Sequence, residues 1–432
     1  MLIPKDEWYL HRGYLHFDLP ISYKKAKFLV TNPASVAVHP FLPLIGYTIS
    51  SKKVKKDRST NTLEIKHKER EIAYSSHVDS HIYAYYACML KRLYEANIKL
   101  AKIDDSVLAF RELGKSNIDF ASQAFNKIKE FGECSVVALD FSKFFDSLNH
   151  DFLKSKLAAL LSCEKLPLDY FNVFKSLTKY SKVDRFKLYS LFNISENNSK
   201  NGRNRVCSID EFRRVVRANK LIVANNDGFG IPQGTPISAL LSNIYMYDFD
   251  ISMRAFVNEV GGTYYRYCDD MLFIVPIDKK DSVITFAKEQ ITKIKVQIND
   301  DKTEVRTFIK DSISGQLKAD KPLQYLGFMF DGENAYIRSS SLARYSDKLK
   351  RGVRLANKTK IKYNSIRASN GLEERSLYKR KLYSRYTHLG GRNFITYGLR
   401  AARTMNSKTI KRQLKPLWAK FHQELSKYSK ET

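Results

Sequence analysis

The chain has 432 residues, of which 43% are hydrophobic, and 74 Lys and Arg outnumber 45 Asp and Glu to give a net charge of +29. No stretch is apolar and long enough to span a membrane, so the sequence excludes a membrane-spanning protein. The excess of cations favours a nucleic-acid partner, because phosphates bind Lys and Arg by releasing counterions.

The N-terminus and the cysteines predict a cytoplasmic protein. Residues 1–6 lack the apolar core of a secretory signal. The cysteines are odd in number and form no Cys-x-x-Cys pair, so we expect neither disulfides nor structural zinc, and a reducing compartment. They are Cys88, Cys134, Cys163, Cys207 and Cys268.

We expect a basic, loop-like break in the N-terminal region at residues 50–61.

Asp140 is a candidate metal ligand. Residues 136–140 form a short apolar run of β-forming residues that ends in this residue. A carboxylate at the end of a buried strand is costly unless it is paired. Asp140 either caps the helix that follows or lies beside Asp269 on a neighbouring strand, where clustered carboxylates require divalent cations.

A polar segment at residues 195–205 interrupts the centre of the chain. Ser208 and Glu211 then have the spacing of a capping box, which predicts a short basic helix through Arg213, Arg214 and Arg217. The segment is either a surface loop or a binding element for a partner RNA.

Residues 230–236, Gly-Ile-Pro-Gln-Gly-Thr-Pro, form a loop before an apolar helix. Gly234 permits a close backbone approach, Thr235 is the expected N-cap, and Pro236 suits the first helical position.

Two β-type runs, residues 262–266 and 271–275, flank Tyr267-Cys268-Asp269-Asp270. This pattern predicts a tight hairpin with two adjacent carboxylates at its tip. A rigid turn that holds acids together is suited to binding a divalent metal.

The last quarter of the chain is strongly basic. Residues 341–432 hold 24 Lys and Arg against five Asp and Glu, which is +19 of the net charge. We expect helices near residues 339–344, 377–382 and 410–428, with Pro416 kinking or restarting the last of them. So large an excess of one sign favours a helical region that grips a nucleic-acid duplex over a merely solvated face.

Taken together, these segments resemble reverse transcriptases. Asp140 with Phe144 and Phe145, the loop at 232–236, and Tyr-Cys-Asp-Asp resemble, in order, three signature motifs of that family. Residues 296–303 are similar to its Asn-x-x-Lys-Thr segment, and residues 323–328 to the hairpin that grips the primer. The resemblance covers about residues 131–338.

The resemblance implies an α+β right-hand polymerase, with a palm built on an antiparallel sheet packed by helices and an α-helical thumb. Fingers and an N-terminal extension would occupy residues 1–130, and the palm 131–338 with a finger-like insertion at 165–225. Residues 339–432 would form the basic thumb.

The resemblance also implies residue roles. Asp140, Asp269 and Asp270 would be catalytic and, with the backbone carbonyl of Phe141, would hold two Mg²⁺ or Mn²⁺ ions. Phe145 would exclude a ribose 2′-hydroxyl or, alternatively, is a core aromatic. Residues expected at the nucleotide are Lys68, Arg70, Phe145, Gln233, Gly234 and Lys302. Residues expected at the primer and template are Tyr267, Tyr325, Leu326, Gly327, Lys379, Arg380, Lys411 and Arg412.

The flanking segments narrow the resemblance. Residues 12–18 and 68–80 resemble bacterial antiphage defence-associated reverse transcriptases, and within that group the second type, which acts with a noncoding RNA. We therefore expect an enzyme that uses dNTPs to copy a structured noncoding RNA into cDNA. The alternatives are a template-independent or protein-primed DNA polymerase of the abortive-infection type, and a maturase-like RNA-binding protein.

Overall fold

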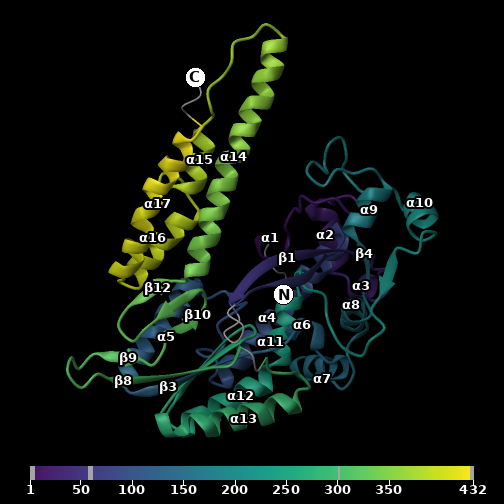
Figure 1. The fold of residues 1–432 in the computed structure, drawn as a ribbon. Coiled ribbons are helices and arrows are strands. Elements are labelled where there is room, and N and C mark those ends of the chain that lie inside the picture. The colour runs from purple at the N-terminus through teal and green to yellow at the C-terminus, as the bar shows by residue number, and fades with distance from the viewer. Residues whose placement is uncertain (1–4, 57–61, 300–301, 429–432) are drawn as a thin grey trace.

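The computed structural model describes residues 5–56, 62–299 and 302–428, and it shows three sheets surrounded by helices (Figure 1). Runs of helices and runs of mostly antiparallel strands make up the chain until residue 338, after which the described residues form helices only. The predicted α+β class is confirmed.

The largest sheet is antiparallel and has five strands in the order β6-β7-β3-β8-β9. Its central strand begins two residues before the predicted run and ends at Asp140, as predicted. The predicted hairpin forms from β6 and β7, with Cys268 in the turn at φ 60°. The bounds are β3 Cys134–Asp140, β6 Thr263–Tyr267, β7 Asp270–Val275, β8 Glu304–Lys310 and β9 Leu317–Ala319.

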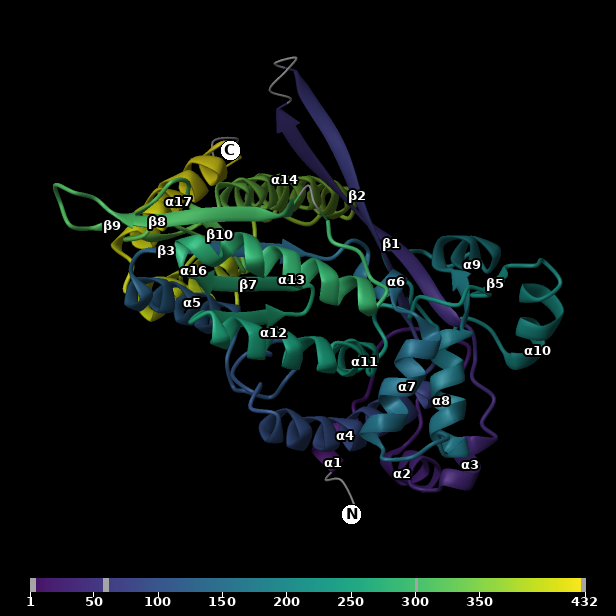
Figure 2. The ribbon, with the colours of Figure 1, turned by 90° about the horizontal axis from the view of Figure 1, so that it is seen from below.

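Both faces of this sheet are buried, because successive side chains of a strand point to opposite faces. Val137 and Phe273 belong to the core that includes helices α4, α7, α11, α12 and α13. Val136 and Leu272 belong to a second core with α5 and the C-terminal helices. Figure 2 shows α12 and α13 covering the sheet and running along its strands. The helix bounds are α4 His77–Leu100, α5 Asn117–Phe131, α7 His150–Leu160, α11 Ser238–Tyr245, α12 Tyr247–Glu259 and α13 Lys280–Lys293.

A four-stranded sheet in the order β2-β1-β4-β5 joins the N-terminal region to the insertion at 165–225. The loop predicted at residues 50–61 is wrong, because β1 and β2 form a long hairpin through most of it; residues 57–61 lie outside the described part. Strand pairing here outweighs the polar, basic composition that suggested a loop. The strands are β1 Leu44–Lys56, β2 Leu63–Tyr74, β4 Ser181–Asp184 and β5 Ile222–Ala224.

The remaining elements of residues 5–322 are helices, most of them short. The predicted capping box of Ser208 and Glu211 is present, but it starts only one helical turn before the backbone widens into a π-helix. The elements are α1 Lys5–Trp8, α2 Tyr23–Val30, α3 Pro33–Ala37, α6 Phe144–Ser147, α8 Leu168–Thr178, α9 Arg185–Leu191, α10 Ile209–Glu211, η1 Phe212–Val216 and η2 Ile277–Lys279.

The C-terminal helices stand beside a small three-stranded sheet and pack along one another (Figure 1). Of the kink or restart predicted at Pro416, the restart does not occur, since α17 continues through this residue. The carbonyl left without its helical partner belongs to the exposed Arg412, where water can satisfy it. The elements are β10 Leu323–Tyr325, β11 Phe328–Phe330, β12 Ala335–Ile337, α14 Ser339–Ser369, α15 Arg380–Tyr386, α16 Phe394–Thr404 and α17 Lys408–Ser426.

In residues 5–56, 62–299 and 302–428, no helix combines the length and the apolar character that crossing a bilayer requires.

Candidate active site

Three carboxylates meet at one end of the five-stranded sheet. Asp140 is the last residue of β3, and its register partner across the antiparallel ladder is Asp270, the first residue of β7. The expectation that Asp269 would pair with Asp140 from a strand is wrong in detail, because Asp269 lies in the turn before β7. Directly paired residues project from the same face, so Asp140 and Asp270 share a face of the sheet.

The electrostatics show that the three charges act on one another. Burial, followed by the charges of Asp269 and Asp140, raises the pKa of Asp270 to about 7. The side chain of Asp270 still reaches solvent, which limits the effect of burial and makes the like charges beside it an important cause of this shift. A cation bound there would remove that repulsion.

Asp140 combines an ion pair with an unpaired atom. Its Oδ2 accepts a hydrogen bond from Lys302 Nζ, whereas its buried Oδ1 has no hydrogen-bond partner among the described residues. Burial raises the pKa of Asp140; the hydrogen bond from Lys302 opposes this shift, and the charge of Asp269 adds to it. Asp140 does not cap the following helix, which begins at Phe144 with Lys143 at its N-cap position.

The cations expected at the triphosphate are Lys68 and Arg70 on β2 and Lys302 just before β8. Lys68 and Arg70 are two residues apart on β2, so they project from the same face. Burial, then the charges of Arg70 and Lys302, lower the pKa of Lys68, while Asp140 and Asp269 raise it. The structure therefore brings Lys68 and Lys302 into the electrostatic field of the carboxylates. That these cations bind a nucleotide stays a prediction. Asp300 and Asp301, next to Lys302, lie outside the described residues.

The loop at residues 230–236 links β2 to the residues after β3. The backbone N–H of Ala73 donates to the carbonyl of Gln233 at 2.8 Å, and Gln233 Nε2 donates to Asp146 Oδ1 at 3.4 Å. Gly234 has φ +116°, and a Cβ there would lie 2.7 Å from the Ala73 carbonyl oxygen. The predicted close backbone approach at Gly234 is confirmed.

The start of the next helix differs from its prediction. Helix α11 begins at Ser238, with Ile237 and not Thr235 at the N-cap position, so Pro236 lies outside it. The Thr235 hydroxyl is instead hydrogen-bonded to that of Ser238, which donates to the carbonyl of Pro232. This local loop bonding competes with capping.

The phenylalanines after β3 are not equivalent. Phe141 and Phe144 stack with ring centroids 4.9 Å apart and are 2% and 3% exposed, which makes them core residues. Phe145 is half-buried, and its carbonyl accepts a hydrogen bond from Ile231 N. The aromatic expected at the sugar is therefore the more accessible of the adjacent pair.

The expected primer hairpin is present in β10 and β11. Leu326 and Gly327 form its turn with φ 45° and 92°, and the Leu326 carbonyl accepts a hydrogen bond from Asn117. The buried Tyr325 lies in the field of Asp270, which raises its pKa after burial. Tyr267, the last residue of β6, is register partner to Asp270. The basic candidates Lys379, Arg380, Lys411 and Arg412 are exposed at the N-terminal parts of α15 and α17.

The sequence reasoning missed a buried network that supports the carboxylate turn. Arg266 on β6 is fully buried and forms a two-pronged ion pair with Asp250 of α12. Its Nη1 also donates to Asn243 Oδ1 and to the carbonyl of Cys268, inside the turn. A charged residue in an otherwise buried strand, one place before Tyr-Cys-Asp-Asp, was the available signal.

The chemistry of the donors fits a divalent cation. Carboxylate oxygens are hard ligands of the kind Mg²⁺ and Mn²⁺ prefer, and Asp140 Oδ1 has no hydrogen-bond partner among the described residues. In the same part of the chain, however, no three metal-ligating side chains are grouped closely enough to hold an ion. The candidate ligands are Asp140, Asp269 and Asp270.

Comparisons with known proteins identify the family. The model of the family described as "Reverse transcriptase (RNA-dependent DNA polymerase)" matches residues 55–330, more than half of the chain. No curated protein matches.

Several solved structures of telomerase resemble this chain remotely. Apo telomerase from Candida tropicalis has a TM-score of 0.43 at 13% identity, over 93% of this chain and 63% of that chain. Telomerase from Candida albicans in complex with a fragment of telomeric RNA has a TM-score of 0.39 at 12% identity, over 96% and 66%.

The chain spans only 55% of a third telomerase structure, the C-terminally truncated apo form from Candida tropicalis, at a TM-score of 0.39. Similarities this remote support no conclusion about activity. The family match, by contrast, covers β3 with Asp140, the loop at residues 230–236, the β6–β7 hairpin and most of the sheet β10-β11-β12. This chain therefore belongs to the reverse transcriptase family and has the α+β right-hand polymerase fold.

Proposed function

We propose that this chain is an RNA-directed DNA polymerase that copies a noncoding RNA into cDNA for antiphage defence. The observation that carries the polymerase assignment is the cluster of Asp140, Asp269 and Asp270 beside Lys302 and Lys68. Carboxylates with neighbouring cations are what nucleotidyl transfer needs, namely metal ligands next to groups that bind phosphates.

Each group has a distinct task in this proposal. Asp140 and Asp269 would be the principal metal ligands, and Asp270 would lie closer to the primer end. Two divalent cations, Mg²⁺ or Mn²⁺, would lower the pKa of the primer 3′-hydroxyl and neutralise charge on the triphosphate. Lys302 protonates or neutralises the departing pyrophosphate, and its present partner Asp140 keeps it at the site.

The remaining residues orient the nucleotide. Lys68 and Arg70 bind the triphosphate from β2, where Arg offers a planar fork suited to phosphate oxygens. Gln233 and Gly234 line the path of the templating base and incoming nucleotide. Phe145 lies under the sugar, where its half-buried ring leaves room for a deoxyribose only.

The defence role rests on the flanking segments. Residues 12–18 and 68–80 resemble those of the second type of defence-associated reverse transcriptase. The net charge of +29 supports a large RNA partner.

Replacing the carboxylates tests the polymerase assignment. Asp269→Ala with Asp270→Ala, and separately Asp140→Ala, should lower incorporation of radiolabelled dNTPs by at least about a hundredfold, since several kcal/mol of charge stabilisation are lost. Binding of RNA should persist, because the phosphate contacts lie elsewhere. Asp281→Ala, an exposed carboxylate on α13, is the matched control.

Pretreatment of the template with RNase distinguishes the alternatives. Incorporation that survives RNase would replace the proposal with template-independent or protein-primed synthesis. RNA binding without any incorporation by the parent chain would indicate a maturase-like binding protein.

A further inference from the structure

A second cluster of functional side chains lies away from the carboxylates, at the start of α4. His77 and His81 are one helical turn apart, so they share a face of this helix. They are buried, with 1% and 4% of their surfaces exposed. Imidazoles are polar, and at such burial they normally have hydrogen-bond partners.

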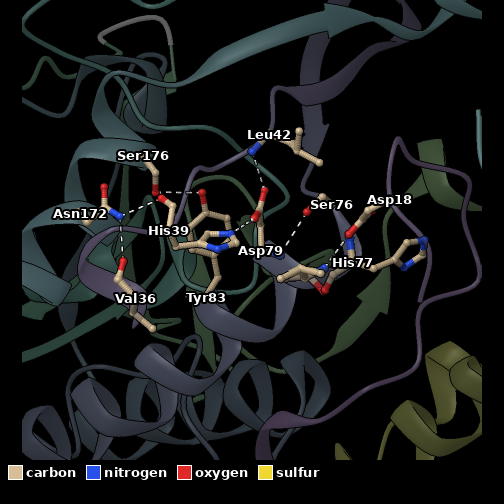
Figure 3. A network of polar contacts seen from close by, with 12 residues as sticks. Asp18, Val36, His39, Leu42, Ser76, His77, Asp79, Tyr83, Asn172 and Ser176 are labelled. Atoms are coloured by element: carbon tan, nitrogen blue, oxygen red, sulfur yellow. Dashed lines mark hydrogen bonds and ion pairs between the residues drawn. The ribbon is translucent and has the colours of Figure 1, made fainter. Parts of the chain in front are cut away.

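The hydrogen-bond network that fixes this end of α4 uses backbone amides, and His77 takes part in it through its backbone N–H (Figure 3). Asp18 accepts hydrogen bonds from the backbone N–H groups of His77 and Val78, and Ser76 Oγ accepts one from Asp79 N. The Asp79 carboxylate is in turn occupied by His39 and by the N–H of Leu42. The helix terminus is therefore already satisfied by the protein.

The imidazoles are held in place but are not fully paired. Tyr14 stacks on His77 with centroids 5.1 Å apart, and Tyr9 stacks on His81 at 4.8 Å. The Tyr14 carbonyl faces the His77 ring. His77 Nε2 and His81 Nδ1 nevertheless have no hydrogen-bond partner among the described residues, and neither does the buried Arg12 Nε.

Cations of the N-terminal segment and of the insertion lie near this end of α4. Burial is the main cause of the lowered pKa of both histidines; the charge of Asp18 opposes the shift of His77, and the charges of His11 and Arg12 add to both shifts. In the insertion, Lys200 Nζ lies 3.2 Å from where a Cβ on Gly13 would be. The insertion is fastened here by a 2.8 Å hydrogen bond from Val206 N to the His16 carbonyl.

These groups suit an anion better than a metal. A guanidinium beside two imidazoles repels a metal cation, and among the described residues no three metal-ligating side chains form a site. An Arg fork, imidazole N–H donors and a Lys are typical phosphate-binding groups. His11 and Gly13, the neighbours of Arg12 in the sequence, are exposed.

We propose that Arg12, His77 and His81, with Lys200 from the insertion, bind a phosphate group, and that this phosphate belongs to the backbone of the RNA partner. The source of the phosphate rests on the proposed function, whereas the phosphate chemistry does not. The site would fasten the RNA to the N-terminal region and the insertion together, apart from the polymerising centre.

The test compares Arg12→Gln with Lys24→Gln in the full chain. Lys24 is an exposed cation on the neighbouring α2, so its replacement removes the same charge outside the cluster. Binding of a structured RNA is measured by fluorescence anisotropy across a salt titration. We expect Arg12→Gln to weaken binding about three- to tenfold at 0.1 M salt and to reduce the log–log salt slope by about 0.7 to 0.9, because one phosphate fewer is neutralised. Lys24→Gln should change neither.

A second variant, His81→Phe, and a second ligand, inorganic phosphate, test the same site independently. His81→Phe retains the stack on Tyr9 but removes the N–H donor, so it decides the matter if Arg12→Gln does not fold. Inorganic phosphate, compared with NaCl at equal ionic strength, should raise the thermal midpoint of the parent more than that of either variant.

The outcomes separate the sources of the ligand. Stabilisation by inorganic phosphate without a change in RNA affinity would support the phosphate site and eliminate RNA as its source. Folded variants that equal the parent in both assays would overturn the proposal. Neither assay requires DNA synthesis, so failure of the polymerase assignment would be seen separately.

Discussion

At the scale of single residues, Asp140 shows how contacts decide between roles that a sequence leaves open. An acid after a strand is an ordinary helix cap, and the next helix begins within four residues. The structure instead pairs one oxygen of Asp140 with Lys302, and the other oxygen is buried and has no hydrogen-bond partner in residues 5–56, 62–299 and 302–428. Such an atom is costly unless a ligand satisfies it.

The two adjacent phenylalanines should behave differently when truncated. Phe145→Ala should raise incorporation of ribonucleotides relative to dNTPs by about tenfold or more, because about 1.4 kcal/mol of steric discrimination corresponds to each factor of ten. Single-nucleotide addition with matched rNTP and dNTP measures the ratio.

Phe144→Ala is the control for that experiment. Phe144 is 3% exposed, so its truncation should cost about 3 to 5 kcal/mol of stability without a specific change in sugar choice. If Phe145→Ala discriminates as well as the parent, the sugar is selected by another residue.

At the scale of elements, the turn that holds Asp269 depends on helices far from it in sequence. Arg266 connects β6 to Asp250 on α12 and to Asn243 on α11, and it also binds the Cys268 carbonyl in the turn. We regard Arg266 as a positioning residue, because it acts on the carboxylates through this backbone contact.

Removing Arg266 should separate folding from positioning. Arg266→Met leaves a buried, unpaired Asp250 and should lower the free energy of unfolding by about 3 to 5 kcal/mol. Arg266→Met with Asp250→Leu should recover most of that loss, since both charges are gone. Denaturant titration measures both effects.

The double variant should still polymerise poorly. With the Cys268 carbonyl released, kcat should fall about tenfold or more while KM for dNTP changes little, because the triphosphate cations are intact. A double variant with full kcat would show that Arg266 serves stability alone.

The buried histidines of α4 should make the protein sensitive to acid. Burial, followed by the charges of Arg12, His77 and His11, lowers the pKa of His81 to about 4. Between pH 6.5 and 4 the unfolded chain therefore takes up a proton that the folded chain refuses, so stability is lost as pH falls through this window.

We expect His81 alone to reduce the free energy of unfolding by about 2 kcal/mol between pH 7 and pH 5, since one pKa unit corresponds to about 1.4 kcal/mol. Denaturant titrations in phosphate-free buffer measure this. His81→Phe does not titrate and should lose correspondingly less over the same range. An equal loss in parent and variant would contradict the assignment.

At the scale of the whole molecule, the carboxylates and the most basic region of the chain lie in different parts of the fold. The carboxylates lie at the five-stranded sheet, whereas residues 341–432 carry +19 of the net charge and form the helices that stand beside it (Figure 1). Repeated addition needs the duplex to stay bound between steps, and a basic helical unit supplies that attraction.

Charge reversals in this unit should lower processivity more than chemistry. Replacing Lys379, Arg380, Lys411 and Arg412 by Glu should weaken template binding and reduce the log–log salt slope by about 0.7 for each phosphate that the variant no longer neutralises. Addition of a single nucleotide at high template concentration should stay nearly normal.

The control and the competing interpretation use the same assay. Lys280→Glu with Lys293→Glu on α13, across the molecule from α15 and α17 in Figure 1, should have a smaller effect. Loss of binding to one folded RNA but not to a random RNA of equal length would show that these helices recognise shape instead.

Elements with a short-range sequence pattern could be predicted from the sequence alone. The apolar run ending in Asp140, the hairpin around Asp269 and Asp270, and the glycine loop at Gly234 follow from alternation, turn chemistry and backbone freedom over a few residues. These were also the segments that carried the resemblance to reverse transcriptases.

Contacts between residues that are distant in the sequence are known only from the tertiary structure. The extension of β1 and β2 through a basic segment, the uninterrupted helix at Pro416, and the ion pair of Arg266 with Asp250 each depend on partners far away in the chain. The same holds for Tyr14, which stacks on His77 of α4, and for Lys200, which reaches Gly13 from the insertion. Local propensities differ by a kcal/mol or less per residue, roughly, so burial and pairing across the fold override them.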